Sequence, residues 1–145
     1  MSQVASVLRV SADVGELARV RAFVRQQARD AGADVGAIDD LVTAVDESVT
    51  NVIVHGYRGR QGSIEVEMNV DEPRIVVRVR DEAPPFNPTT APDPDISLPL
   101  ERRRPGGLGV FLARELADSV DYKQTATGNE LTLIKYMQTK GGPGC

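Results

Sequence analysis

The chain has 145 residues, of which 41% are hydrophobic and 26% are charged, as expected for one soluble globular domain. Its formal net charge of −4 argues against a general role in binding nucleic acid or an anionic membrane surface. No apolar run approaches the roughly 20 residues that cross a bilayer, and the N-terminus lacks the pattern of a signal peptide. We therefore expect a cytoplasmic protein without a membrane-spanning segment.

The sequence contains one cysteine, Cys145, and one histidine, His55. A lone cysteine cannot form an internal disulfide, and these two residues are too few to build a zinc site within the chain. The sequence shows no internal repeat and no sign of a second domain. We expect residues 1–140 to form a single domain and the glycine-rich residues 141–145 to form a flexible tail.

In chain order, the first elements that the sequence predicts are a strand and a helix. Residues 3–10 are rich in valine and are typical of a strand. Asp13 followed by Glu16 resembles a capping box, which predicts a helix over residues 14–31 with an apolar stripe on its inner face. Gly32 is expected to end this helix.

The second predicted helix begins near Val35 and includes Leu41–Tyr57. At about 100° per residue, its apolar side chains fall within one arc, namely Ile38, Leu41, Val42, Val45, Val49, Val52 and Ile53. Opposite this arc, Glu47 and Asn51 lie one turn apart, so a carboxylate and a carboxamide project into the same space. Their neighbours are small or apolar, which favours a second partner for this face, either protein or ligand. The alternative is a helix with an ordinary polar side.

A β-hairpin is predicted after this helix. Ser63–Val70 alternates between apolar and polar residues, and Arg74–Arg80 alternates again after a turn. From Asp81 to Pro105 the periodicity stops in a stretch rich in proline. A loop of this length in a compact domain is usually either functional or disordered.

The remaining elements are a helix and two strands. The glycines at 106–109 lead into an amphipathic helix, and strands follow near residues 119–124 and 130–137. Hairpin strands with helices grouped between them predict an α+β fold. We expect a two-layer sandwich in which a mixed, mostly antiparallel sheet carries its helices on one face.

Three stretches carry polar groups that core packing does not explain. The first is the pair Glu47 and Asn51. The second is Asp81 at the end of a strand, which either caps the following turn or accepts a hydrogen bond from a ligand amine. The third is the GGLG run at 106–109, where backbone N–H groups could approach a phosphate, although glycine also serves ordinary tight turns. Arg102–Arg104 would add phosphate contacts or form a solvated surface.

In this order, the three stretches resemble a known family. EsvtNvivHGY, DeaPPFnP and RRRPGGLGVFLARELADSVDY, the last followed by GNELTLIK, are similar to the N-box and the two glycine boxes of the Bergerat-type ATPase fold. Gyrase, Hsp90 and histidine kinases share that fold. Within this superfamily the chain most resembles the small anti-sigma-factor serine kinases of bacterial partner-switching systems. The resemblance covers about residues 5–137, and the combination of boxes is much more specific than any single box.

The resemblance implies a site for ATP and Mg²⁺. Asn51 would ligate the metal ion, and Glu47 would act as the general base or orient the attacking hydroxyl. Asp81 would receive the amino group of adenine.

The resemblance also assigns residues around the phosphates and the base. The residues that would wrap the phosphates are Gly106, Gly107, Leu108 and Gly109. Arg104 would supply a positive charge in the lid over the phosphates. Thr132 would support the adenine-binding aspartate. The chain departs from the family at Ala83, where glycine is common two residues after the aspartate. A methyl group there either narrows the adenine pocket or is tolerated, depending on the φ angle.

The function that the resemblance implies is that of a protein serine/threonine kinase acting as an anti-sigma factor. Its substrate would be an anti-anti-sigma (antagonist) protein, it would hold a sigma factor, and a homodimer is compatible with it. Neither nucleic acid nor a membrane is an expected partner. The alternative, motivated by Ala83, is a weakly catalytic or non-catalytic nucleotide-binding module that sequesters its partner. A histidine autokinase is disfavoured, because the only histidine, His55, lies within the N-box.

Overall fold

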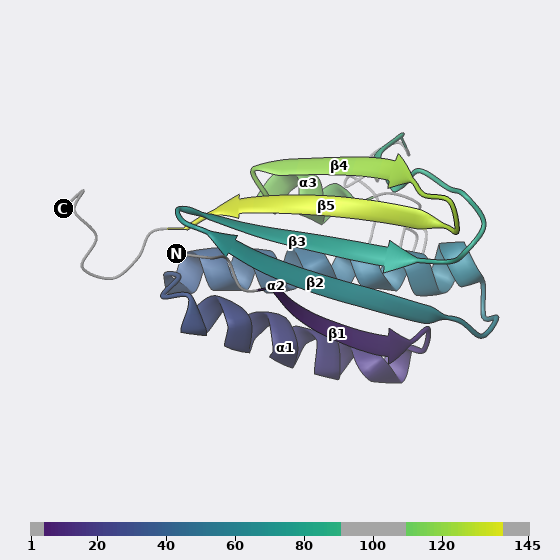
Figure 1. Ribbon diagram of the computed structural model, residues 1–145, viewed down its shortest axis with the longest axis horizontal. Helices are drawn as coiled ribbons and strands as arrows, with labels where there is room; N and C mark the ends of the chain where they lie inside the picture. The colour runs from purple at the N-terminus through teal and green to yellow at the C-terminus, as the bar shows by residue number, and fades with distance from the viewer. Residues whose placement is uncertain (1–4, 91–109, 138–145) are drawn as a thin grey trace, which may run out of the picture.

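Residues 5–90 and 110–137 are described by the computed structural model, and they form a five-stranded sheet with helices on one face (Figure 1). The strands are β1 Ala5–Ser11, β2 Ser63–Asp71, β3 Arg74–Asp81, β4 Ser119–Gln124 and β5 Asn129–Tyr136. Their order across the sheet is β1-β2-β3-β5-β4, and each neighbouring pair is antiparallel. The predicted α+β sandwich is confirmed, although no parallel pair occurs among the described strands.

In the described part of the chain, three α-helices cover one face of the sheet, behind the strands in Figure 1. They are α1 Leu17–Asp30, α2 Val35–Asn51 and α3 Phe111–Leu116. Three short irregular helices accompany them: η1 Val14–Glu16 and η3 Pro88–Thr90 are 3₁₀-helices, and η2 Val52–Tyr57 is a π-helix that continues α2. Within the described ranges no helix has both the length and the apolar character needed to cross a membrane.

The core lies between the sheet and the apolar arc of α2. All seven residues predicted for that arc are buried. They meet the inward-facing residues of the sheet, among which Ile64, Val77 and Leu133 are fully buried. The hydrophobic periodicity therefore located the inner face of α2 correctly, because that periodicity follows directly from the helical repeat.

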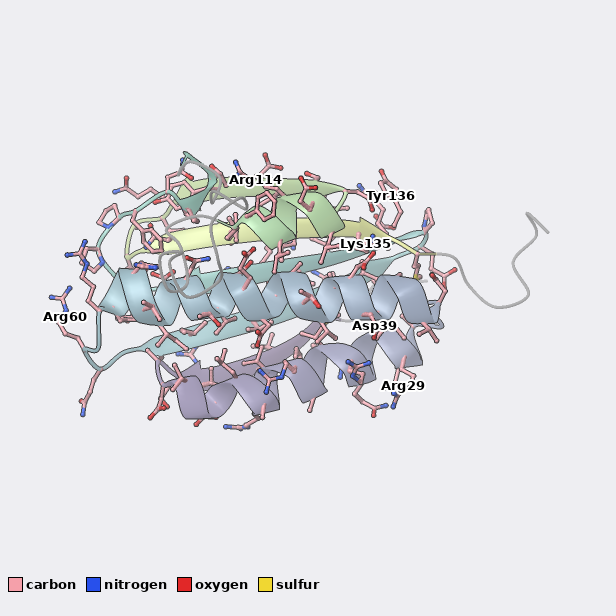
Figure 2. The ribbon with its side chains drawn as sticks, turned by 180° about the vertical axis from the view of Figure 1, so that it is seen from behind. Arg29, Asp39, Arg60, Arg114, Lys135 and Tyr136 are labelled. Atoms are coloured by element: carbon pink, nitrogen blue, oxygen red, sulfur yellow. The ribbon has the colours of Figure 1, made fainter. Side chains whose placement is uncertain are left out.

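The second face of α2 is partly covered. Ala44, Ser48 and Asn51 are at most 1% exposed, although they lie outside the predicted apolar arc. By contrast, Thr43 and Val54 on the side opposite the arc are exposed. Part of the cover is α3, which packs against α2 (Figure 2). α3 of the same chain therefore covers part of this face, and the expected second partner, protein or ligand, stays a prediction.

Local details at the ends of elements differ from the sequence-based expectations. Asp13 caps η1 by accepting a hydrogen bond from the Gly15 N–H at 2.8 Å. The Glu16 carboxylate accepts from Ser11 and Arg19, so the reciprocal capping box is not formed. The first α-helix accordingly starts at Leu17, after a 3₁₀ turn.

Candidate active site

A pocket opens between the second face of α2 and the inner face of the sheet. Its polar lining residues are Ser48, Asn51, Asp81, Tyr122 and Asn129. Apolar side chains complete the lining, namely Val52, Val79, Phe86, Pro88 and Leu131. Apolar walls combined with a few convergent polar groups are typical of a site for a small organic ligand.

Asp81 is the buried carboxylate of this pocket, with only 6% of its surface exposed. It is the last residue of β3 and follows Val77 and Val79 on the inner face of that strand. Two donors reach it, the side-chain amide of Asn129 at 2.8 Å and the backbone N–H of Ala83 at 2.9 Å. Both bonds end on Oδ1, and among the described residues no protein donor reaches Oδ2.

Burial raises the pKa of the Asp81 carboxyl group. The hydrogen bonds from Asn129 and Ala83 act in the opposite direction, because they stabilise the carboxylate. Burial also raises the pKa of the two tyrosines that face this group, Tyr57 on η2 and Tyr122 on β4. The pocket thus surrounds one acidic group with neutral, partly buried hydrogen-bonding groups.

Asn129 is a part of the site that the sequence did not single out. Its Nδ2 donates to Asp81 and to the carbonyl oxygen of Ala83 at 3.2 Å. Its Oδ1 accepts from the Phe86 N–H at 3.3 Å and from the hydroxyl of Tyr122. One carboxamide therefore joins β3, β4, β5 and the segment after β3.

The assignment of Thr132 as the support of Asp81 is corrected by the strand pairing. Asp81 lies opposite Asn129 in the β3–β5 register, whereas Thr132 lies opposite Arg78. Leu131 and Leu133 point into the core, and side chains alternate along a strand, so Thr132 is on the outer face. The contact that was expected from Thr132 is made by Asn129.

Gly128 allows β5 to approach Asp81 closely. A Cβ atom at this position would lie 1.9 Å from the backbone oxygen of Asp81. Any side chain there would push β5 away from β3 and separate the paired residues. The Gly-Asn sequence at 128–129, followed by alternating buried leucines, is the signal that could have identified Asn129 in advance.

The methyl group of Ala83 is accommodated away from the pocket lining. Ala83 is 3% exposed and is absent from the residues that line the pocket. Among the described non-glycine residues only Arg58 has a positive φ, so the backbone at Ala83 does not require glycine. Gly56 provides the space, because a Cβ at Gly56 would lie 3.3 Å from the Ala83 methyl and 2.9 Å from Phe86.

Asn51 lines the pocket from α2, and Glu47 lies one turn earlier on the same helix without being among the lining residues. The side-chain Nδ2 of Asn51 donates to the backbone oxygen of Glu47 at 3.1 Å, which orients the carboxamide on the pocket wall. The two carboxylate oxygens of Glu47 accept the backbone N–H groups of Leu112 and Ala113 at 3.1 and 2.8 Å. Glu47 therefore joins the start of α3 to α2, a contact that the sequence did not predict.

Burial raises the pKa of Glu47, and this effect outweighs three opposing ones. The hydrogen bonds from Ala113 and Leu112 and the positive charge of Arg114 each favour the carboxylate. Arg114 in turn donates to the carbonyl oxygen of Thr89 at 3.1 Å, which ties α3 to η3.

The donor set fits Mg²⁺ bound mainly through phosphate oxygens and water. Within the described residues, no group of three His, Cys, Asp or Glu side chains could hold a metal ion by itself. Mg²⁺ usually takes one or two protein oxygens in nucleotide sites, and the buried Asn51 can supply one. Arg104, Gly106, Gly107, Leu108 and Gly109, expected around the phosphates, lie outside the described residues.

Comparison with known proteins identifies the family of the chain. Residues 10–135 match the family model described as "Histidine kinase-like ATPase domain". The serine-protein kinase RsbW of Listeria monocytogenes is 35% identical over 115 residues, covering 76% of this chain and 73% of the relative. The protein of the same name from Bacillus mycoides is 26% identical over 135 residues, covering 90% and 84%.

A solved structure shares the fold. It is the crystal structure of the RsbU and RsbW domains of Rv1364c from Mycobacterium tuberculosis, with a TM-score of 0.68 and 22% identity. The match covers 94% of this chain, which spans 32% of that longer chain. This protein belongs to the family of histidine kinase-like ATPase domains, whose nucleotide is ATP, and it is related within that family to serine-protein kinases named RsbW.

Proposed function

We propose that this protein is an ATP-dependent serine/threonine protein kinase that acts as an anti-sigma factor in a cytoplasmic partner-switching system. Its substrate would be a serine or threonine hydroxyl of an anti-anti-sigma protein, and a sigma factor would be its second partner. One observation carries the proposal: Glu47 and Asn51 stand one turn apart on α2, beside a pocket that holds the buried Asp81. The serine-protein kinases among its relatives support the same conclusion.

Adenine would bind between the apolar walls of the pocket. Its amino group would donate to Oδ2 of Asp81, since the protein donors occupy Oδ1. Val79, Leu131 and Phe86 line the same space and would pack against the flat base. Guanine carries a carbonyl in place of that amine, so the carboxylate would face an acceptor and adenine would be preferred.

Asn51 would hold Mg²⁺ through its carboxamide oxygen, together with the ATP phosphates. The hydrogen bond from Nδ2 to the backbone of Glu47 fixes which end of the amide is presented to the pocket. When bound, the ion neutralises charge on the phosphates and orients them for transfer.

Glu47 would act as the general base in the transfer step. Its carboxylate would take the proton from the substrate hydroxyl as the hydroxyl oxygen bonds to the γ-phosphorus. The bond from that phosphorus to the bridging oxygen breaks, which releases ADP. An ionised carboxylate has about four acceptor positions, so Glu47 can keep its two bonds to α3 and still accept from a hydroxyl.

A second candidate is a nucleotide-binding module that sequesters a protein without catalysing transfer. The observation that favours it is the engagement of both Glu47 oxygens by α3. In this case the carboxylate would serve only to position the helix, and nucleotide would act as a structural ligand.

A transfer assay distinguishes the two candidates. Proteins captured from the native host with and without Mg·ATP would be identified, purified and incubated with the wild-type kinase and radiolabelled ATP. The proposal expects label on a serine or threonine of one captured protein. If the protein binds ATP and its partners but labels none of them, it is a sequestering module.

A further inference from the structure

The short helix α3 is held at both ends by charged side chains from other elements. It contains six residues, and a helix of that length is not stable alone in water. At its N-terminal end, Leu112 and Ala113 donate their backbone N–H groups to Glu47. At its C-terminal end, the carbonyl oxygen of Leu116 accepts a hydrogen bond from the ammonium group of Lys135 at 2.7 Å.

Lys135 reaches this position from the sheet. It follows Leu131 and Leu133 on the inner face of β5, and its side chain is only 15% exposed. Its ammonium also donates to the Asp40 carboxylate of α2 at 3.0 Å. Figure 2 shows Lys135 between α3 and α2. A largely buried lysine needs such partners, because removing its charge from water is otherwise costly.

The two carboxylates are spaced to match the length of α3. Asp40 and Glu47 are seven residues apart on α2, so they share a face and are separated by about 10.5 Å along the axis. A helix of six residues spans about 9 Å. The N-terminus of α3 meets Glu47 and its C-terminus meets Lys135, so both charges have the sign that favours the helix dipole.

We propose that Lys135 is a positioning residue for phosphoryl transfer. It holds the C-terminal end of α3 in place, so that the backbone amides of Leu112 and Ala113 remain hydrogen-bonded to Glu47. The inference rests on the proposed role of Glu47 as the base. Loss of Lys135 would let α3 move at its C-terminal end. The Glu47 carboxylate would then lose the two donors that orient it, while the adenine end of the pocket, built by Asp81 and Asn129, would keep its contacts.

The test compares Lys135→Met with Lys135→Arg and with a control, Lys123→Met. Lys123 is an exposed lysine of β4, 72% accessible, whose nearest carboxylate is 3.9 Å away. Amide hydrogen exchange of Leu112 and Ala113 is measured by NMR, together with kcat and KM for ATP. Exchange of β3 amides such as that of Val77 shows whether each variant keeps its core.

We expect Lys135→Met to accelerate exchange of the Leu112 and Ala113 amides about tenfold, since exchange follows the free energy of local opening. The kcat value should fall about tenfold, with KM for ATP within about twofold of wild type. Lys135→Arg keeps a cationic donor, so its amide exchange rates and its kcat should be close to those of the wild type. Lys123→Met should match the wild type in both quantities. If Lys135→Met loses its core, Asp40→Asn replaces it, because it weakens the contact that holds the Lys135 ammonium beside α2, with a smaller expected effect in the same direction.

Two outcomes would overturn the inference. If the two amides exchange at the wild-type rate in Lys135→Met, then Lys135 does not hold α3 on Glu47. If they exchange faster while kcat is unchanged, then Lys135 anchors α3 without serving the reaction. Absence of transfer by the wild-type protein would instead refute the proposed kinase function. Hydrogen exchange of Leu112 and Ala113 would still show whether Lys135 holds α3 against Glu47.

Discussion

The two ends of the candidate site, the proposed adenine end at Asp81 and the proposed transfer end at Glu47, are built in different ways. At the adenine end, Asp81 and Asn129 are neighbours in the antiparallel pairing of β3 with β5, so the ladder itself sets their separation. At the transfer end, Glu47 on α2 meets the backbone of a six-residue helix that lies 65 residues further along the chain. One end depends on a continuous sheet, and the other on the packing of a short helix, with Ala113 in the core, and on a few hydrogen bonds to its ends.

This difference has a functional consequence. The backbone hydrogen bonds between β3 and β5 together hold the adenine end in place. A substitution there should therefore change nucleotide affinity without moving Glu47. At the transfer end, Glu47 and Lys135 each contact one end of α3. A substitution of either residue should therefore change the rate of the reaction. Each prediction below tests one side of this comparison.

The largest effect is expected for Glu47→Ala. A carboxylate acting as the base contributes about 10²–10⁴-fold to the rate, so transfer should fall by that factor while ATP affinity stays within about twofold. Single-turnover phosphorylation and calorimetric titration measure the two quantities. Glu115→Ala, an exposed carboxylate of α3, is the control and should transfer at the wild-type rate. Equal rates for Glu47→Ala and the wild type would remove Glu47 from the mechanism.

A smaller effect, on affinity, is expected for Asp81→Asn. Asparagine would present a donor where the adenine amine needs an acceptor, so ATP should bind at least tenfold more weakly, or by about 1.4 kcal/mol. Circular dichroism should show an intact fold. Asp121→Asn, on an exposed part of β4, controls for the loss of one charge. Unchanged ATP affinity in Asp81→Asn would refute the assignment of the adenine site.

Asn129→Ala should weaken ATP binding by at least roughly threefold to tenfold, because the hydrogen bond to Asp81 alone is worth about 0.5–1.5 kcal/mol. The bonds to Ala83, Phe86 and Tyr122 are lost with it. The pH dependence provides a sharper test. The hydrogen bond from Asn129 lowers the pKa of Asp81, so its removal should raise that pKa further. If the ionised form binds adenine, affinity is lost as the pH falls through the pKa, and the loss should begin at a higher pH in the variant. If ATP affinity depends on pH in the same way in Asn129→Ala and in the wild type, Asn129 does not control the pKa of Asp81.

The smallest effect is expected for Ala83→Gly. Ala83 is not among the residues that line the pocket, so ATP affinity should stay within about twofold of wild type. The unfolding free energy should fall by about 0.4–1 kcal/mol, because glycine gives the unfolded chain more conformational freedom. Calorimetry and urea denaturation measure these two quantities. Affinity that increases fivefold or more would show that the methyl group narrows the site.

The features that the sequence predicted well are those set by local periodicity. The strand alternation at Ser63–Val70 and the apolar arc of α2 follow from repeats of about two and 3.6 residues. The same helical repeat placed Glu47 and Asn51 on a common face. Asp81 could be placed at the end of a strand because the alternation stops there. Each of these inferences uses a few consecutive residues.

The features that could not be predicted depend on how distant segments meet. Thr132 and Asn129 are three residues apart, and an odd shift along a strand moves a side chain to the opposite face of the sheet. Only the register of β5 with β3 decides which of them reaches Asp81. The contacts of Glu47 and Lys135 with α3 likewise join segments that no local pattern connects. The π-helix at Val52–Tyr57 continues α2 with a similar apolar pattern, so its different hydrogen bonding was not visible either.

The comparison of the two ends is tested most directly by the transfer rate at saturating ATP, measured for Asp81→Asn and Glu47→Ala with the same antagonist protein. Raising the ATP concentration should restore Asp81→Asn to near the wild-type rate, because its defect is in affinity. Glu47→Ala should remain at least about 10²-fold slower at every concentration, because its defect is in the transfer step. Recovery of Glu47→Ala at high ATP, or failure of Asp81→Asn to recover, would contradict the separation of the two roles.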